Sequence, residues 1–428
     1  MESLLKQINI SHEQTADALK IAYSFRTQAT GAVVTVEDSL RHQPSGISSA
    51  ALKAGIKHEN IFDIGVIKLH KPACVAGVFT RNRCASPSVV IDREHVADGK
   101  AQALVVISKN ANLYTPTADS DTRAVIEKVA SETDIKFCDV LISCTGVIGR
   151  TLPLAKVQLA LSSLENNLKT GLIPEIAEAI LTTDTCAKVA SVRLGELLLC
   201  GFAKGAGMIE PNMATMLAYF FTNIAISPRQ LKEILQEVAD LSFNSISIDT
   251  DTSTSDTVLI FSTGEIPADS ATLSDFKLAL LTLALNLSHK IVYRAEGATK
   301  LIQARVSSAL NNAHARAVAK FIVNSPLIKT AIFGADPNWG RIVMAIGKPI
   351  SGIETAIDPT AITIAINDEV LFHSGRQLAA DLGRLSSSIK DSKFIDIHVC
   401  LGEGDGEHTA WGCDLSYDYV KINAEYTT

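Results

Sequence analysis

The chain has 428 residues, which is longer than an ordinary single-core domain, so two lobes or one large layered core is expected. Hydrophobic residues make up 47% of it and charged residues 20%, a balance typical of globular proteins that excludes a disordered chain. The formal net charge of -7 disfavours nucleic acid and anionic membrane as partners, because both reward basic surfaces.

The start of the chain shows no targeting signal. Residues 1–14 (MESLLKQINISHEQ) contain acidic residues and no apolar run of the signal-peptide kind. The longest apolar stretch, residues 278–287, is too short to span a bilayer. None of the eight cysteines forms a pair separated by only two residues, so the usual zinc and redox motifs are missing. We expect a soluble, cytoplasmic protein with reduced, buried thiols.

Residues 1–43 are expected to form an N-terminal extension, a polar and poorly periodic appendage that ends in the loop-like run RHQPSG. After it, short apolar runs alternate with helical patterns to the end of the chain. Five of these runs predict strands, at residues 103–107, 139–143, 257–261, 361–366 and 394–401.

Four helices are predicted between the strands. Apolar residues from Val157 to Leu168 follow one face of a helix that Gly171 is placed to end. Ser227 and Pro228 are an N-cap and first-turn pair for a helix whose apolar face reaches Leu241. Further helices are predicted over residues 275–290 and 377–390. The alternation indicates a layered α/β architecture.

The segment with the most unusual composition is Lys204–Met216 (KGAGMIEPNMATM). Its glycines and proline, set between two apolar runs, can hold a tight, strained turn. Strain favours an N→O acyl shift, in which the Thr215 hydroxyl attacks the Ala214 carbonyl and the ester then hydrolyses. The freed α-amine of Thr215, with a pKa of about 7.7–8.0, would act as general base for its own hydroxyl. On composition alone, a glycine-rich turn between two core elements is the simpler interpretation.

A second turn of interest is ISCTGVIGRTL (Ile142–Leu152), which follows a predicted strand. Small residues such as Gly146 and Gly149 at a strand end let backbone N–H groups point at a developing oxyanion. An ordinary strand-to-helix turn explains the same pattern.

Two polar segments suggest ligands that their spacing does not support. GEGDGEHTAWG (Gly402–Gly412) lacks the third glycine of a dinucleotide loop and the GK[ST] of a phosphate loop. DTDTSTSD (Asp249–Asp256) has Thr254 and Ile260 where a calcium loop needs glycine and glutamate. No metal site is therefore predicted, and the second segment is either a polar turn or a wall of an active site.

Several segments taken together resemble one known family, and they occur in the family's order. They are TGVIGRTLP, the TTDT at Thr182, KGAGMIEPNMATMLAYFFT, the DTVL at Asp256, the RAEGATK at Arg294, GADPNWGR and the tail AWGCDLSYDYVKINAEYTT. From about Gly46 to the C-terminus, the chain resembles the bifunctional ornithine acetyltransferases, also called glutamate N-acetyltransferases, of arginine biosynthesis.

The resemblance implies a layered, αββα-like α/β fold of the self-processing, N-terminal nucleophile type, with a second, smaller C-terminal lobe. It implies cleavage between Ala214 and Thr215. After the extension, residues 44–214 would form an α chain that holds the oxyanion hole. Residues 215–428 would form a β chain that supplies the nucleophile, the C-terminal lobe and a tail that closes the site. The two chains are expected to stay together, as α2β2.

The resemblance also implies the chemistry. Thr215 takes an acetyl group from N2-acetyl-ornithine, releases ornithine and passes the acetyl group to glutamate in a ping-pong cycle. Thr145 and Gly146 form the oxyanion hole. No cofactor or metal is implied, although some members of the family accept acetyl-CoA, which makes it a candidate co-substrate. Substrate-binding positions map onto Thr182, Lys204, Thr215, Glu296, Asn423 and Thr428.

These residue types suit the substrates. Lys204 and the Thr182 hydroxyl offer a charge and a donor to an α-carboxylate. Glu296 suits an ammonium group of the substrate or the Thr215 amine. Asn423 and Thr428 lie near the chain end, so the tail must fold back into the site.

The chain departs from the family in ISKNANLYTPTADSD (Ile107–Asp121), where Lys109 stands in place of a usual glycine. If that glycine needs a positive φ, Lys109 forces a different local turn beside the oxyanion hole. Two other functions stay open. One is a self-processing, aminopeptidase-like hydrolase of the related fold, and the other is an uncleaved, silent relative that acts as an interaction protein.

Overall fold

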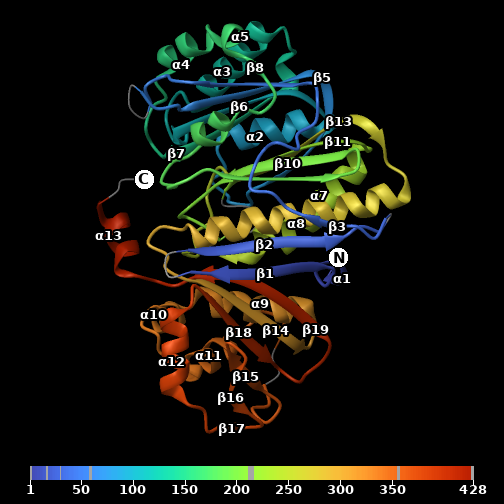
Figure 1. Cartoon of the computed structure of the whole chain (residues 1–428). Coiled ribbons are helices and arrows are strands. Elements are labelled where there is room, and N and C mark those ends of the chain that lie inside the picture. Colours follow the sequence, from blue (N-terminus) through green and yellow to red (C-terminus); the bar gives the residue numbers. More distant parts are fainter. Residues whose placement is uncertain are drawn as a thin grey trace.

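The computed structural model describes residues 2–15, 18–28, 30–56, 60–210, 216–353 and 357–425. Within these ranges the strands form a nine-stranded, a seven-stranded and a three-stranded sheet (Figure 1). No helix in the described part of the chain has the length and apolar character needed to cross a bilayer.

The nine-stranded sheet has the order β7-β6-β5-β13-β11-β10-β9, with β4 paired to β5 and β8 paired to β4. Its strands are β4 (Ile47–Leu52), β5 (Ile64–Phe79), β6 (Lys100–Asn110), β7 (Val140–Val147), β8 (Lys169–Thr170), β9 (Lys188–Leu194), β10 (Leu197–Lys204), β11 (Leu217–Ala225) and β13 (Thr257–Pro267). The 16-residue strand β5 pairs with β4 and β6 along its first part and with β13 along its last part. It therefore joins two halves of the sheet.

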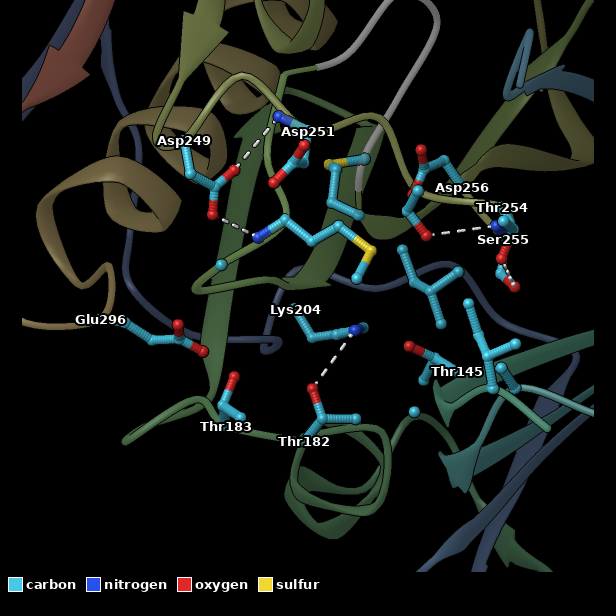
Figure 2. Close-up of a pocket in the computed structure, with 18 of the residues that line it drawn as sticks. Thr145, Thr182, Thr183, Lys204, Asp249, Asp251, Thr254, Ser255, Asp256 and Glu296 are labelled. Atoms are coloured by element: carbon cyan, nitrogen blue, oxygen red, sulfur yellow. Dashed lines mark hydrogen bonds between the residues drawn. The ribbon is translucent and has the colours of Figure 1, made fainter. Parts of the chain in front are cut away.

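The two halves face one another, and helices cover their outer faces (Figure 1). A core that includes Ile67 and Leu104 from one half and Phe202 and Phe221 from the other fills the space between them. The outer helices are α3 (Ala118–Thr133), α4 (Leu154–Leu161) and α5 (Leu164–Asn167) on the first half, and α7 (Pro228–Leu241) and α8 (Ser270–Tyr293) on the second. Two further helices, α2 (Pro87–His95) and α6 (Pro174–Ala179), contribute Val89 and Ile176 to the core between the halves. This layering confirms the predicted αββα arrangement. Lys204, which ends β10, and Thr145 of β7 reach the same space (Figure 2).

The second lobe is built on the seven-stranded sheet, in the order β12-β19-β14-β18-β15-β16-β17. Its strands are β12 (Ile246–Ser247), β14 (Leu301–Ala309), β15 (Thr363–Ile366), β16 (Glu369–His373), β17 (Arg376–Gln377), β18 (Phe394–Cys400) and β19 (Gly406–Cys413). Its helices are α9 (Asn312–Asn324), α10 (Pro326–Phe333), α11 (Trp339–Ile346), α12 (Leu382–Asp391) and the C-terminal α13 (Tyr417–Glu425). Short 3-10 turns occur at Val96–Asp98, Phe137–Asp139 and Phe243–Ser245.

The N-terminal extension is not an appendage, so that prediction is wrong. After α1 (Glu2–Leu5) it forms the extension sheet of β1 (Ile8–Gln14), β2 (Leu19–Arg26) and β3 (Val33–Thr35). Tyr23 and Phe25 of β2 are only 1% and 2% exposed, and they pack in the same core as α8. On the other side His12 stacks on Phe394 of the second lobe with ring centroids 3.9 Å apart. The extension therefore lies between the two lobes (Figure 1).

The predicted strands are all present, but two of the predicted helices differ. The helix expected over residues 157–168 is two helices, because the chain breaks between α4 and α5 at Ser162 and Ser163. The helix expected from residue 377 begins only at Leu382, because Arg376 and Gln377 pair with β16 as a strand. The eight cysteines are free thiols as expected, but Cys84, Cys138 and Cys186 are exposed rather than buried.

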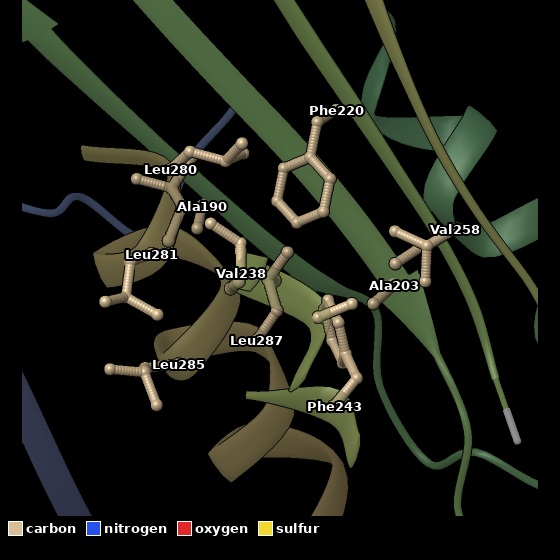
Figure 3. Packing of buried hydrophobic residues seen from close by; sticks show 14 of the residues in the cluster. Ala190, Ala203, Phe220, Val238, Phe243, Val258, Leu280, Leu281, Leu285 and Leu287 are labelled. Atoms are coloured by element: carbon tan, nitrogen blue, oxygen red, sulfur yellow. The ribbon is translucent and has the colours of Figure 1, made fainter. Parts of the chain in front are cut away.

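One substitution tests the contribution of the core between α8 and the sheet. Phe220 of β11 is 0% exposed and lies among Val238, Phe243 and Leu287 (Figure 3). Phe220→Ala removes most of that side chain and leaves a cavity, so we expect a loss of about 3–5 kcal/mol in the free energy of unfolding. Urea unfolding measures it. The control Leu159→Ala, at a position 76% exposed, should change the value by less than about 0.5 kcal/mol. Equal losses in both variants would contradict the packing described.

Candidate active site

A polar cavity of about 190 Å³ lies where β7, β10, β11 and β13 come together (Figure 2). Six residues that the sequence assigned to the site line it, although they come from distant parts of the chain: Thr145, Gly146, Thr182, Lys204, Glu296 and Asn423. Met216 and Leu217, at the start of β11, line the same cavity. The other predicted positions, Ala214, Thr215 and Thr428, fall outside the described residues.

The turn at the end of β7 is held against β6. Gly146 pairs with Lys109 and has a φ of 134°, and a Cβ on it would lie 2.2 Å from the backbone carbon of Lys109. Only glycine fits such a close approach. Lys109 itself has a φ of 71°, the left-handed conformation that glycine favours, at a cost of roughly 1–2 kcal/mol. The expectation that a side chain here forces a different turn is therefore wrong, because the lysine adopts the positive φ.

Lys204 and Thr182 form the positive end of the cavity. The Lys204 ammonium lies 3.4 Å from the Thr182 hydroxyl oxygen (Figure 2). Behind them, the carboxylate of Asp184 accepts hydrogen bonds from the Gly205 amide at 2.6 Å and from the Lys188 ammonium at 2.5 Å. Both side chains of the Asp184–Lys188 pair are sealed from solvent, with 0% and 1% of their surface exposed. A buried ion pair of this kind fixes the chain at the end of β10.

Burial and the charges around Lys204 shift its pKa. Burial lowers the pKa of Lys204, the carboxylates of Asp184 and Asp256 partly offset this, and the ammonium groups of Lys188 and Lys109 lower it further. For Asp184, burial alone would raise the pKa, but the ammonium groups of Lys188 and Lys204 outweigh it and hold the pKa below its usual value. Asp184 therefore stays charged near neutral pH, and its carboxylate favours the ammonium form of Lys204.

The opposite side of the cavity is acidic. Asp249 accepts hydrogen bonds from the amides of Met208 and Ile209 at 2.6 and 2.7 Å, and the Tyr419 hydroxyl donates to it at 3.3 Å. Burial, together with the nearby Asp249 and Glu210, raises the pKa of Asp251. The segment Asp249–Asp256 is thus a wall of the cavity, one of the two alternatives that its composition left open.

Glu296 is held from both sides. Its amide donates to the Ala206 carbonyl at 2.9 Å, and the side-chain amide of Asn423 donates to its carboxylate at 2.9 Å. Gly207 packs against that carboxylate, since a Cβ at Gly207 would lie 2.4 Å from Oε2 of Glu296. The contact from Asn423 shows that α13 folds back to the cavity, as the predicted closing tail requires.

Glu210 anchors the segment that leads towards the predicted cleavage site. Its carboxylate accepts a hydrogen bond from Asn324 at 2.7 Å and lies 3.5 Å from the Lys320 ammonium, both on α9 of the second lobe. Burial lowers the pKa of Lys320 to about 8. The Glu210 amide also donates to the Asp251 carbonyl at 2.9 Å. The end of this segment is therefore bound to both lobes.

The sequence did not single out every residue that shapes the site. Asp184, Lys188, Asp249, Asp251 and Tyr419 were missed as individual residues. Asp184 lies within the TTDT motif and Asp249 begins the polar segment, so their positions were visible but their partners were not. Within the described ranges, no group of three or more His, Cys, Asp or Glu side chains is arranged to hold a metal ion.

The αββα layers, with a polar cavity at the strand ends where the two sheet halves meet, define a layered α/β protein with a candidate active site. A profile described as the ArgJ family matches residues 48–428. This span is most of the chain, and the chain therefore belongs to the ArgJ family. The prediction of an acetyltransferase of arginine biosynthesis is thereby confirmed.

Individual proteins similar to this chain have names of the same family. The chain is 43% identical over 389 residues to "Arginine biosynthesis bifunctional protein ArgJ 2" of Nostoc sp., with 90% of this chain and 98% of the relative covered. It is 40% identical over 398 residues to "Glutamate N-acetyltransferase Oat2" of Streptomyces clavuligerus, with 92% and 100% covered. A crystal structure of arginine biosynthesis bifunctional protein argJ from Bacillus halodurans is 37% identical, covers 50% of this chain and 100% of its own, and has a TM-score of 0.45.

Lys109 carries the same charge as Lys204 and lowers its pKa, which can be tested by removing the Lys109 ammonium. Lys109→Met removes a nearby ammonium group while it keeps a side chain of similar length, so the pKa of Lys204 should rise. NMR titration of protein labelled with [13C]lysine measures it, and the Lys204 signal is identified by its loss in Lys204→Arg. A pKa of Lys204 that is unchanged or lower in Lys109→Met would contradict the electrostatic coupling.

Proposed function

We propose that the chain cleaves itself between Ala214 and Thr215 and that Thr215 then carries an acetyl group from N2-acetyl-ornithine to glutamate. The relatives named for arginine biosynthesis and for glutamate N-acetyl transfer support this proposal. The observation that carries it is the meeting of Thr145, Gly146, Thr182, Lys204, Glu296 and Asn423 around one cavity. That cavity is bordered by Met216, the residue that follows Thr215 in the chain.

The contacts on either side of residues 211–215 suit a strained scissile bond. On one side the Glu210 amide is bound to Asp251, and on the other the Met216 carbonyl accepts a hydrogen bond from the Thr257 amide at 3.0 Å. With both ends held, strain can favour attack of the Thr215 hydroxyl on the Ala214 carbonyl. The C–N bond breaks, the nitrogen takes up a proton, and water hydrolyses the resulting ester. The products are the Ala214 carboxylate and a free Thr215 amine and hydroxyl.

The sheet provides a reason for the two chains to stay together after cleavage. β10 precedes the cleavage site and β11 follows it, and the two strands pair antiparallel from Leu199↔Thr222 to Lys204↔Leu217. On its other side β11 pairs with β13. Separating the chains would therefore break the centre of a buried sheet. As the family resemblance implies, we propose that the cleaved protein assembles as α2β2.

The charges around the cavity suit an acetylated amino acid. Lys204, helped by Thr182, would bind the α-carboxylate, and Glu296 would pair with the side-chain ammonium of ornithine. Glu296 and Thr145 lie on opposite sides of Lys204 (Figure 2). The acetyl group would thus lie towards Thr145 and Gly146, which would stabilise the oxyanion that forms when Thr215 attacks.

The proposed transfer has two half-reactions. Thr215 Oγ bonds to the acetyl carbon, the bond to the ornithine nitrogen breaks, and the Thr215 amine passes the hydroxyl proton to the leaving amine. The amine of glutamate then attacks the acetyl ester and regenerates the hydroxyl. Neither half-reaction needs a cofactor, and acetyl-CoA would serve only as an alternative acetyl donor.

Thr215→Ala tests the cleavage step. Without the hydroxyl no ester can form, so the variant should remain one chain of 428 residues and should transfer no acetyl group. Cleavage at residue 214 divides the chain into halves of equal length, which run together on a gel, so intact-mass spectrometry is the suitable measurement. Two fragments from Thr215→Ala would place the nucleophile elsewhere. A wild-type protein of full length would show an uncleaved relative.

Incubation with labelled N2-acetyl-ornithine tests the transfer step. We expect labelled N-acetylglutamate, with sustained ornithine release only when glutamate is present, because the acetyl-enzyme needs an acceptor. Chromatography of the labelled products measures both. Continuous release of ornithine and free acetate without glutamate would instead indicate a hydrolase. A parallel reaction with acetyl-CoA and glutamate determines whether acetyl-CoA is a donor.

Gly207→Ala tests the role of Glu296. The added methyl group would lie 2.4 Å from Oε2 of Glu296, and the flexible carboxylate can move away more easily than the backbone. Loss of a charged hydrogen bond costs about 1.5–3 kcal/mol, so the KM for N2-acetyl-ornithine should rise roughly ten-fold or more. Steady-state kinetics measures it, with Gly340→Ala, which has room for a methyl group, as the control. An unchanged KM in Gly207→Ala would remove Glu296 from the ammonium site.

A further inference from the structure

A second cavity lies outside the active site and depends on the N-terminal extension. It has a volume of about 270 Å³, against about 190 Å³ for the substrate cavity. Its walls are β2 of the extension sheet, the start of β9 and the last turns of α8. We call it the extension cavity. The family profile begins only at residue 48, so the wall formed by β2 lies outside the matched part of the chain.

One face of α8 brings polar groups into this cavity. Asn286, His289, Lys290 and Tyr293 follow one another at helical spacing near the end of α8, and all four line the cavity. Asn286 and His289 are each 2% exposed. Asn286 Oδ1 and His289 Nε2 have no hydrogen-bond partner among the described residues. A buried polar atom without a partner costs about 1–3 kcal/mol, so the two atoms point to a polar occupant.

Tyr23 determines what His289 can offer. The Tyr23 hydroxyl lies 2.5 Å from Nδ1 of His289. Burial raises the pKa of Tyr23 and lowers that of His289 to about 3, so both side chains are neutral near pH 7. The buried Tyr23 hydroxyl donates a hydrogen bond to Nδ1 of His289. A neutral imidazole has one N–H group, so the ring proton is then on Nε2. His289 Nε2 is then a donor without a partner, and Asn286 Oδ1 is an acceptor without one, both on residues that line the cavity.

The charge of the lining is positive in an acidic protein. Lys20, Lys188, Lys290 and Arg294 line the extension cavity with one carboxylate, that of Asp38, whereas the whole chain carries -7. Even without Lys188, whose charge is paired with Asp184, three cationic side chains face one carboxylate. Lys290 donates to Asp38 and to the Val189 carbonyl, both at 2.7 Å. These two bonds use two of its three ammonium protons, so the third can bind a ligand.

We propose that the extension cavity is a second binding site, which takes a small organic carboxylate that also carries a hydrogen-bond donor. Lys290 and His289 Nε2 would bind the carboxylate, and Asn286 Oδ1 would accept from the donor. The volume admits a molecule of the size that the substrate cavity holds. This site is independent of the proposed acetyl transfer, because none of these three residues lines the substrate cavity.

The two cavities nevertheless share a wall. Lys188 lines the extension cavity, and its ammonium is paired with Asp184, which holds the Gly205 amide beside Lys204. An occupant of the extension cavity is therefore separated from the carboxylate end of the active site by a single buried ion pair.

Equilibrium dialysis with labelled L-aspartate, which has both carboxylates and an ammonium donor, tests the proposal directly. We expect saturable binding to the full-length protein. Binding should weaken at least ten-fold in Asn286→Leu and in Lys290→Met, and it should survive in Lys204→Met, which damages the active site instead. Lys232→Met, at an exposed position on α7, controls for the loss of one positive charge. Thermal unfolding of each variant shows whether the fold is kept, and Lys290→Met, with its partly exposed side chain, is the variant least prone to misfold.

Several results would contradict a carboxylate site in the extension cavity. Absence of saturable binding, or binding that is lost in Lys204→Met and kept in Asn286→Leu and Lys290→Met, would overturn the proposal. Inorganic phosphate that binds as tightly as L-aspartate would overturn the assignment to carboxylates. Succinate, which lacks the donor, should bind more weakly than L-aspartate, and equal binding would remove the role given to Asn286.

Discussion

The buried ion pair between Asp184 and Lys188 determines the geometry of the site. Neither side chain has contact with solvent, so each charge needs its partner. Asp184 also accepts a hydrogen bond from the Gly205 amide, which fixes the chain immediately after Lys204. This contact helps to direct the Lys204 ammonium, which forms the positive end of the cavity. The same pair separates the active site from the extension cavity.

The αββα layers bring the rest of the site to this point. β5 joins the two sheet halves, so the ends of β7 and β10 meet although they are far apart in the sequence. The acidic wall of Asp249–Asp256 and Tyr419 of α13 line the side of the cavity opposite Lys204. A cavity that is positive at one end and acidic at the other suits an amino acid with a free α-carboxylate and an ammonium group, whereas the first residue of an aminopeptidase substrate has an ammonium group but no free α-carboxylate. This polarity favours acetyl transfer between amino acids over the hydrolase alternative.

Regular elements were predictable where one local signal dominated. The N-cap Ser227 with Pro228 predicted the start of α7, and apolar runs such as residues 257–261 predicted buried strands. The extension was missed although Leu19, Ile21, Tyr23 and Phe25 alternate with other residues as in a half-buried strand.

Of the site, the family motifs predicted the residues that line the cavity. The motifs could not predict the hydrogen-bond partners of Asp184 or Asp249, because those partners lie on other segments that only the folded chain brings close. Lys109 could not be interpreted from sequence either, since its positive φ is imposed by the approach of Gly146.

Trapping the acetyl-enzyme shows whether Thr215 carries the acetyl group. The protein would be mixed with N2-acetyl-ornithine without glutamate, quenched in acid, digested and analysed by mass spectrometry. The account predicts one acetyl group on the hydroxyl of Thr215, at the start of the second chain, which disappears when glutamate is added before the quench. An acetyl group on another residue, or product formation with Thr215 unmodified under all quench times, would contradict the account.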